Sequence, residues 1–159
     1  MLRLSKKVLF AIEAVLDIAC HGNGAVQSRD ITRRQCIPQR YLEQALQELV
    51  RQGILVGVRG PRGGYRLARE AAHISVGDIV RVVDKGEITE DLLDGTGGSA
   101  LGRNVVRPLW SDVRNDVMTQ LDDVSIDALC AEADALGVTR DGAQDVARDV
   151  ARDVSGGHG

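Results

Sequence analysis

The chain has 159 residues, of which 43% are hydrophobic and only 3% aromatic. This length fits one domain with at most a tail, and the core must consist mainly of Val, Leu, Ile and Ala. No apolar run approaches the roughly 18 residues that a membrane span needs, and the acidic Glu13 and Asp17 after the basic N-terminus argue against a signal peptide. We therefore expect a cytoplasmic protein without a membrane partner.

The charge is divided unevenly along the chain. The formal net charge is −3, but residues 1–69 contain 12 Lys and Arg against 5 Asp and Glu, a net charge of +7. Residues 70–159 contain 8 against 18, a net charge of −10. Such asymmetry indicates that the N-terminal part contacts a polyanion, although a solvated surface without a partner remains the alternative.

Residues 5–21 are predicted to form an amphipathic helix that glycine ends near residue 22. Ser28 is then a candidate N-cap for a short second helix that ends near Cys36, and Pro38 can open a third helix. The third helix has an apolar stripe at Leu42, Ala45, Leu46, Leu49 and Val50. Two short helices with a tight connection are typical of a helix-turn-helix. The polar face of the third helix suits base edges in a major groove, the alternative being a solvated helix face.

A hairpin is predicted directly after the third helix. Ile54–Val58 and Tyr65–Leu67 are short β-type runs, and the turn between them is rich in glycine. Pro61 stiffens the turn, while glycine permits positive φ and close backbone approach. Arginine side chains at the tip can reach phosphates or a narrow minor groove. A hairpin in this place is a wing.

The C-terminal half begins with a helix predicted from the capping pattern Ser75-x-x-Asp78, extending to Val83. Residues 85–104 lose periodicity and are expected to form a flexible loop. Asn104 is a candidate cap for a long helix whose apolar positions are Val106, Leu109, Trp110, Val113, Val117, Leu121 and Val124. This stripe exceeds what one small domain needs and favours a homodimer interface, packing on its own domain being the alternative. Ser125 can cap a final short helix, and residues 138–159 are expected to be a disordered tail.

Three stretches together resemble a known family. Tyr41-Leu-Glu-Gln44, Gly53-Ile-Leu55 and the wing, Arg59-Gly-Pro-Arg-Gly-Gly-Tyr-Arg-Leu67, resemble the Rrf-two (Rrf2) family of bacterial transcription regulators. The similarity covers about residues 1–136. It implies a mostly α fold with a small β-wing: a winged helix-turn-helix DNA-binding domain in residues 1–84 and a dimerisation helix with a final short helix in residues 105–137. It also implies that the protein is a homodimer that binds a palindromic double-stranded DNA operator. It further implies that this regulator acts as a repressor.

The resemblance also implies site residues. The third helix would face the major groove and the wing would enter the minor groove, with Glu43 accepting from cytosine amino groups. The candidate DNA-binding residues are Ser28, Gln39, Arg40, Tyr41, Glu43, Gln44, Arg59, Gly60, Pro61, Arg62 and Gly63.

The sequence departs from the family pattern in its cysteines. Cluster-binding members carry three cysteines in the loop before the long helix, whereas residues 85–104 contain none, and Asn104 and Arg107 replace the expected cysteine and histidine. An iron–sulfur cluster needs such ligands, so we expect no cofactor and no metal. Cys36 stands where the family commonly has glycine. It is a candidate redox residue, or alternatively a small buried residue that is strained if its φ is positive.

Three other functions remain to be weighed. A metal, redox or cluster sensor would need ligands outside the usual loop, drawn from Cys20, Cys36, Cys130 or the histidines, and these show no short metal-ligand spacing. A winged helix used for protein contacts is disfavoured by the charge of residues 1–69. An enzyme is disfavoured because the chain lacks the common catalytic motifs. A regulatory protein or small-molecule effector would supply the signal.

Overall fold

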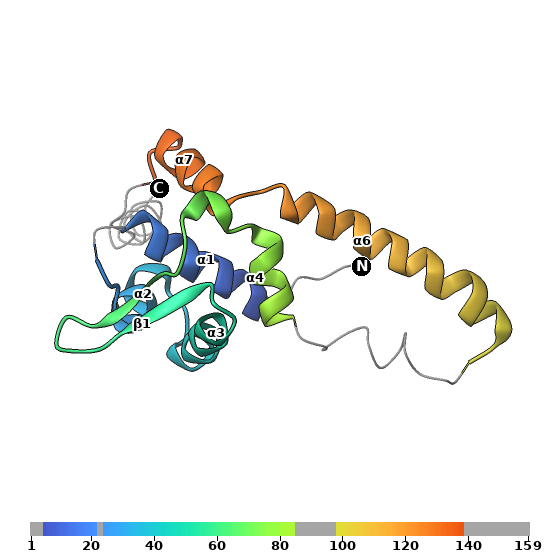
Figure 1. Cartoon of the computed structure of the whole chain (residues 1–159), viewed down its shortest axis with the longest axis horizontal. Helices are drawn as coiled ribbons and strands as arrows, with labels where there is room; N and C mark the ends of the chain where they lie inside the picture. The colour runs from blue at the N-terminus through green and yellow to red at the C-terminus, as the bar shows by residue number, and fades with distance from the viewer. Residues whose placement is uncertain (1–4, 22–23, 85–97, 139–159) are drawn as a thin grey trace, which may run out of the picture.

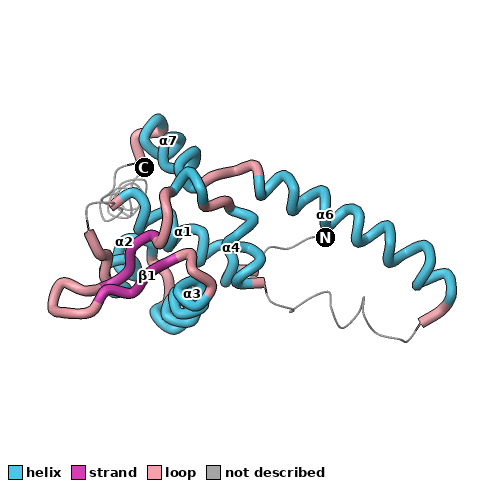
Figure 2. Tube along the Cα trace, in the orientation of Figure 1, coloured by secondary structure: helices cyan, strands magenta, loops and turns pink. Residues whose placement is uncertain are grey.

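The computed structural model describes residues 5–21, 24–84 and 98–138 and is mostly helical, with one antiparallel pair of strands (Figure 1, Figure 2). The elements are α1 (Lys6–Cys20), α2 (Ser28–Gln35), α3 (Gln39–Arg51), β1 (Leu55–Val58), β2 (Gly64–Leu67), the short 3₁₀ turn η1 (Ala71–His73), α4 (Val76–Val83), the π-helical turn η2 (Gly102–Val106), α6 (Arg107–Asp122) and α7 (Ile126–Ala135). The order helix, helix, helix, hairpin confirms the predicted winged helix-turn-helix. Residues 139–159 of the predicted tail and most of the predicted loop lie outside the described residues.

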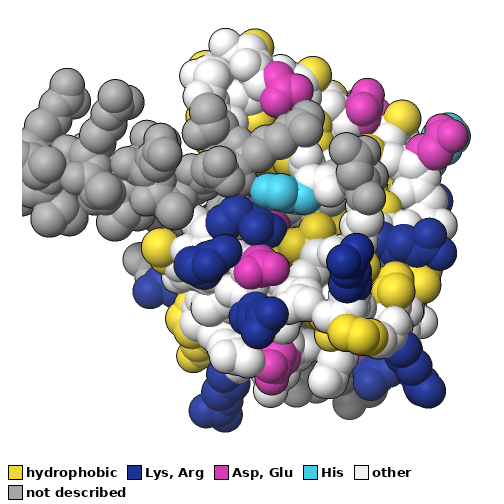
Figure 3. All heavy atoms as spheres, turned by 90° about the vertical axis from the view of Figure 1, so that its left-hand side faces the viewer, with side chains coloured by type: hydrophobic (Ala, Val, Ile, Leu, Met, Phe, Trp, Pro, Cys, Tyr) yellow, Lys and Arg dark blue, Asp and Glu magenta, His cyan; other side chains and the backbone are white. Residues whose placement is uncertain are grey.

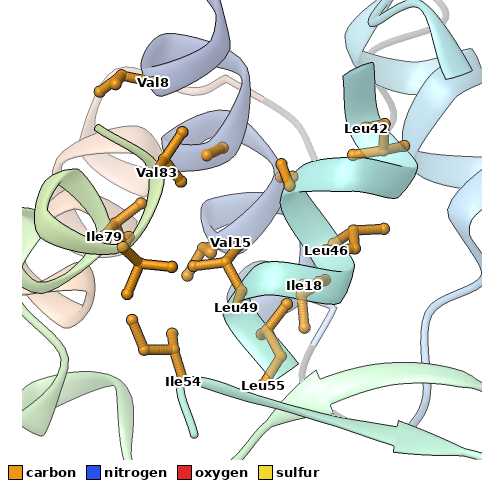
Figure 4. Close-up of a cluster of buried hydrophobic side chains, with 14 of the residues drawn as sticks. Val8, Val15, Ile18, Leu42, Leu46, Leu49, Ile54, Leu55, Ile79 and Val83 are labelled. Carbon is orange, nitrogen blue, oxygen red and sulfur yellow. The ribbon is translucent and has the colours of Figure 1, made fainter. Parts of the chain in front are cut away.

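The core lies where α1, α3 and α4 meet the start of the hairpin (Figure 4). The predicted stripe of α3 is buried at Leu42, Leu46 and Leu49, and Ile54 closes the end of the cluster beside Ile79 of α4. Each such side chain contributes roughly 1.5–3 kcal/mol by leaving water. This packing fixes the rotation of α3 about its axis and therefore decides which of its residues face outward.

Two helix starts agree with their sequence signals, and one does not. The Ser75 Oγ accepts from the Asp78 N–H at 3.0 Å and the Asp78 carboxylate accepts from the Ser75 N–H at 3.1 Å, which confirms the capping box of α4. Ser125 Oγ accepts from the Ala128 N–H at 3.1 Å at the start of α7, also as predicted. Ser28 is not the N-cap of α2, because the helix begins one residue earlier than expected and Gln27 takes that position.

The long helix begins earlier than the sequence indicates. Residues 100–101 are already helical and lead into η2, so Asn104 lies within helical turns and is not an N-cap. Ser99 has the capping role instead, since its Oγ accepts from the Gly102 N–H at 3.1 Å. Pro108 lacks an N–H and interrupts the ordinary hydrogen-bond ladder, and the π-helical turn lies just before it. The predicted loop over 85–104 is thus too long at its C-terminal end.

The end of α6 is fastened to α4. The Val76 N–H donates to the Val124 carbonyl at 2.8 Å, and the Arg81 guanidinium pairs with the Asp122 carboxylate, with one hydrogen bond of 2.7 Å. The hydrogen bond from Arg81 lowers the pKa of the Asp122 carboxyl below its ordinary value. From this attachment α6 extends away from the winged-helix body (Figure 1). No helix in the described ranges is both long and apolar enough to cross a membrane.

Candidate nucleic-acid interface

The turn between α2 and α3 is built on a left-handed residue. Cys36 has φ of 53°, the only positive φ among the described residues other than glycine. Ile37 follows and is buried, which anchors the turn in the core. Cys36 itself is exposed, so the expectation that it is a small buried residue is wrong. A side chain in this backbone region carries local strain, as predicted for a positive φ at this position.

A buried carboxylate fixes α2 against α1. Asp17 is 4% exposed, and its carboxylate accepts two hydrogen bonds from the Arg34 guanidinium, at 2.9 and 2.7 Å, and one from the Gln35 amide at 2.8 Å. The partners occupy the last turn of α2, immediately before Cys36. Sequence reasoning missed this cluster, because its partners lie 17 and 18 positions along the chain on another helix. The cluster therefore fixes the end of α2, which leads into the turn before α3.

The outward face of α3 carries the predicted reading residues. Gln39, Arg40, Tyr41, Glu43 and Gln44 are all exposed. The Gln39 amide donates to a Glu43 carboxylate oxygen at 2.9 Å, so one turn of the helix presents an organised amide–carboxylate pair. The centroids of the Tyr41 ring and the Phe10 ring of α1 are 6.4 Å apart, and the two ring planes are tilted by 44°. This face can offer both hydrogen-bond donors and acceptors to base edges.

Two glycines give the wing its shape. β1 and β2 pair in antiparallel register from Leu55 opposite Leu67 to Val58 opposite Gly64. A Cβ on Gly63 would lie 2.3 Å from the Val58 carbonyl oxygen, and a Cβ on Gly64 would lie 2.3 Å from that of Val26. Both contacts are with backbone atoms, which cannot move aside without distorting the hairpin or the segment beside it. Gly63 is buried, so it supports the tip from beneath.

The wing tip stands beside the N-terminal ends of α2 and α3. Arg59, Gly60, Pro61 and Arg62 are exposed, and the Gln27 amide contacts the Pro61 carbonyl at 3.4 Å. An open hollow between these elements is lined by Gln27, Ser28, Arg29, Gln39, Gly57, Val58, Arg59, Gly60, Pro61, Gly63, Gly64 and Tyr65. Lys and Arg side chains are prominent on this side of the molecule, with a few carboxylates among them (Figure 3).

Only some of the predicted DNA-binding residues line the hollow. Ser28, Gln39 and the wing residues line it, apart from Arg62, whereas Arg40, Tyr41, Glu43 and Gln44 lie along the neighbouring face of α3. Gln27 and Arg29 were missed by sequence reasoning, because a short helix with one buried residue gives little indication of which side faces the hairpin. A rim with the exposed cations Arg29 and Arg59 suits a phosphate chain.

The apolar stripe that runs along η2, α6 and the turn after α6 has two parts with different surroundings. Val106, Leu109, Trp110 and Val113 are 56%, 63%, 39% and 36% exposed. Val117 is half-buried. Leu121 and Val124, at the attached end, pack against the core of the same chain. The predicted stripe is therefore shared between the domain's own core and an uncovered apolar surface.

The residues do not fit an iron–sulfur cluster. Residues 85–104 contain neither Cys nor His, and the described part of the chain has no group of three Cys, His, Asp or Glu side chains placed to hold a metal. Cys20 and Cys130 approach each other, with their sulfurs 3.3 Å apart, while Cys36 lies at the exposed turn. Two thiols without further soft ligands are too few for such a cluster.

Comparison with known proteins identifies similar sequences and similar structures. Residues 4–132 match the family described as Rrf2, iron-dependent transcriptional regulator. The chain is 33% identical over 138 residues to the HTH-type transcriptional regulator IscR of Yersinia pseudotuberculosis serotype O:1b (strain IP 31758), covering 86% of this chain and 84% of that protein. Among solved structures, IscR of T. potens has 32% identity and a TM-score of 0.67, covering 83% of this chain and 88% of the other. CymR, the global cysteine regulator of B. subtilis, has 26% identity and a TM-score of 0.66, with coverages of 83% and 98%.

Proposed function

Because the chain belongs to the Rrf2 family of transcriptional regulators, we propose that it represses transcription by binding a palindromic operator as a homodimer. Membership of the family makes the chain a DNA-binding regulator and not an enzyme.

The observation that carries the proposal is the joint placement of α3 and the wing. The Gln39–Glu43 pair lies on the outward face of α3, and the exposed tip at Arg59 stands next to the start of the same helix. A helix face with paired donors and acceptors fits the major groove of a duplex, and a neighbouring cationic hairpin fits the backbone or minor groove beside it. One duplex can then engage both elements.

The roles of these residues follow from their chemistry. Glu43 accepts from a cytosine amino group, and the Gln39 amide holds that carboxylate in place. Arg59 and Arg62 at the tip neutralise phosphates or enter a narrow minor groove, which positions the protein without reading bases directly. Ser28, at the first turn of α2, lies on the rim of the hollow where a phosphate would rest.

A homodimer through α6 would account for the proposed palindromic operator. The exposed apolar residues lie on η2 and on the part of α6 that projects from the body, so a second copy can cover them by two-fold packing; they are Val106, Leu109, Trp110 and Val113. Two winged helices related by that axis would read half-sites separated by about one helical turn of DNA, roughly 34–36 Å. A dimer bound across a promoter blocks access of the polymerase, which is repression.

We propose further that the regulator acts without an iron–sulfur cluster of its own. Asn104 and Arg107 offer no soft ligand at the positions where cluster-binding relatives place theirs, so the signal enters through an effector, another protein or the cysteines. Protein purified without oxygen should be colourless, contain no stoichiometric iron or labile sulfide, and bind its operator.

The experiment for the proposed function is genome-wide mapping of bound DNA, followed by transcription in vitro from the strongest site. The expected result is a two-fold symmetric motif that overlaps a promoter, and a transcript that decreases as protein is added. An asymmetric motif would contradict the symmetric dimer, and an increase in transcript would contradict repression.

A further inference from the structure

Two cysteines that are 110 positions apart meet between α1 and α7. The Cys20 and Cys130 sulfurs are 3.3 Å apart, and both residues are half-buried. Cys20 is the last residue of α1, Cys130 lies in the middle of α7, and the two helices are in contact. Because a disulfide bond is about 2.0 Å long, the sulfurs need to approach by roughly 1.3 Å.

We propose that Cys20 and Cys130 form a redox-active thiol pair that a hydroperoxide converts to an intramolecular disulfide joining α1 to α7. The proposal goes beyond DNA binding, and its chemistry does not depend on the operator or on the dimer. The bridge would connect α1 to α7, the helix that follows α6. Because α1 carries Asp17, which holds α2, the bridge would also bear on the position of α2.

The surroundings disfavour a thiolate on Cys130. Burial, followed by the neighbouring Cys20 and the carboxylates of Asp127 and Asp134, raises the pKa of Cys130 to about 12. The two thiols share one environment and are coupled, so whichever sulfur loses its proton first attacks the oxidant, since the thiolate is the nucleophile. The other sulfur then closes the bridge.

The reaction balances with the peroxide as the oxidant. The first sulfur attacks one peroxide oxygen, the O–O bond breaks, and that cysteine becomes a sulfenic acid while the other peroxide oxygen leaves as an alcohol or water. The second thiol gives up its proton as its sulfur attacks the sulfenic sulfur, the S–O bond breaks, and the hydroxyl departs with that proton as water. Two thiols are oxidised by two electrons, and one peroxide is reduced.

The bridge has a physical consequence that can be measured. It closes a loop of more than 100 residues, and long loops restrict the unfolded chain most strongly. We therefore expect the oxidised protein to melt several degrees above the reduced protein. The alternative, two inert thiols that merely fill space, predicts no covalent link and no change in melting temperature.

The test uses the full chain, reduced and then treated with hydrogen peroxide. Remaining thiols are alkylated, and the protein is digested and mapped by mass spectrometry without reduction. The expected product is a Cys20–Cys130 linked peptide pair, with Cys36 alkylated and the intact mass lower by roughly 2 Da before alkylation. Dithiothreitol should reverse both the link and the rise in melting temperature.

Matched variants separate this pair from the third cysteine. Cys36→Ser should form the link as the wild type does, whereas Cys20→Ser and Cys130→Ser should not form it and should melt like the reduced wild type. Oxidation that ends in Cys36-linked dimers or in sulfinic acids, with no Cys20–Cys130 peptide in the wild type, would overturn the proposal. The readout is the formation of a covalent bond and does not involve DNA. A negative result would therefore not contradict the DNA-binding proposal.

Discussion

The guanidinium of Arg34 on α2 donates two hydrogen bonds to the buried carboxylate of Asp17 on α1, at 2.9 and 2.7 Å. This pair holds the helix-turn-helix against the rest of the domain. The Asp17 side chain is 1% exposed and that of Arg34 is 13% exposed, so solvent screens the pair little. Removing one member of a buried pair leaves a charge in the interior that is no longer balanced.

We predict that Asp17→Asn destabilises the protein by about 3 kcal/mol or more, because it removes the carboxylate that balances the Arg34 charge. The free energy of unfolding is measured by urea titration. The matched control is Asp30→Asn, since Asp30 pairs with Arg33 at 3.4 Å on the exposed side of α2 and such pairs contribute only about 0–1 kcal/mol. Equal losses in the two variants would contradict the assigned role of Asp17.

The wing provides a second stability prediction. Gly64→Ala places a Cβ 2.3 Å from the Val26 carbonyl oxygen and should destabilise the protein by about 1–3 kcal/mol, because two backbone segments must separate. Gly57→Ala, on the opposite strand, meets nothing within 4 Å and should leave stability unchanged or slightly raised. Thermal melting of both variants checks the difference. If Gly64→Ala melts like Gly57→Ala, the close approach does not exist.

Local patterns predicted much of this fold. The capping box at Ser75, the stripe of α3 through Leu46 and the glycine-rich turn all depend on residues close together in the chain. The start of the long helix was missed, because Ser99 and a π-helical turn replace the cap that Asn104 suggested. Helix starts are poorly determined where two capping residues compete.

Contacts between distant segments could not be predicted from the sequence. Asp17 meets Arg34, and Cys20 meets Cys130, only because α1 passes through the centre of the fold and touches α2 and α7. Local periodicity in the sequence does not indicate which distant residues come into contact. The exposed face of α3 could be predicted from its apolar stripe, whereas the cluster around Asp17 could not.

Binding to DNA should depend on salt through the wing. Arg59→Ala should lower the affinity for specific and random duplexes alike, and should reduce the slope of log affinity against log salt by about 1, because one phosphate contact is lost. Arg114→Ala removes the same charge from the distant α6 and should leave the slope unchanged. Titrations of a labelled duplex at several salt concentrations decide between these outcomes. An unchanged slope for Arg59→Ala would remove the wing from the interface.

The dimer prediction uses residues that are exposed in one protomer. Leu109→Asp combined with Val113→Asp should give a folded monomer, because the two carboxylates would be buried without partners in the dimer but remain in water in the monomer. Sedimentation at micromolar concentration measures the oligomeric state. Leu136→Asp makes the same kind of change at another exposed apolar residue, at the end of α7, and should remain dimeric. A dimeric double variant would place the interface elsewhere.

The central claim, that the outward face of α3 reads base sequence, is tested most directly by selecting duplexes from a random library. The wild type should enrich a two-fold symmetric motif. Glu43→Ala should enrich the same motif with relaxed preference at one symmetry-related position in each half, corresponding to roughly 1–3 kcal/mol of lost discrimination. Glu48→Ala, on the same helix beside Arg51, should return the wild-type motif. Identical motifs for the wild type and Glu43→Ala, or no motif for the wild type, would contradict the account.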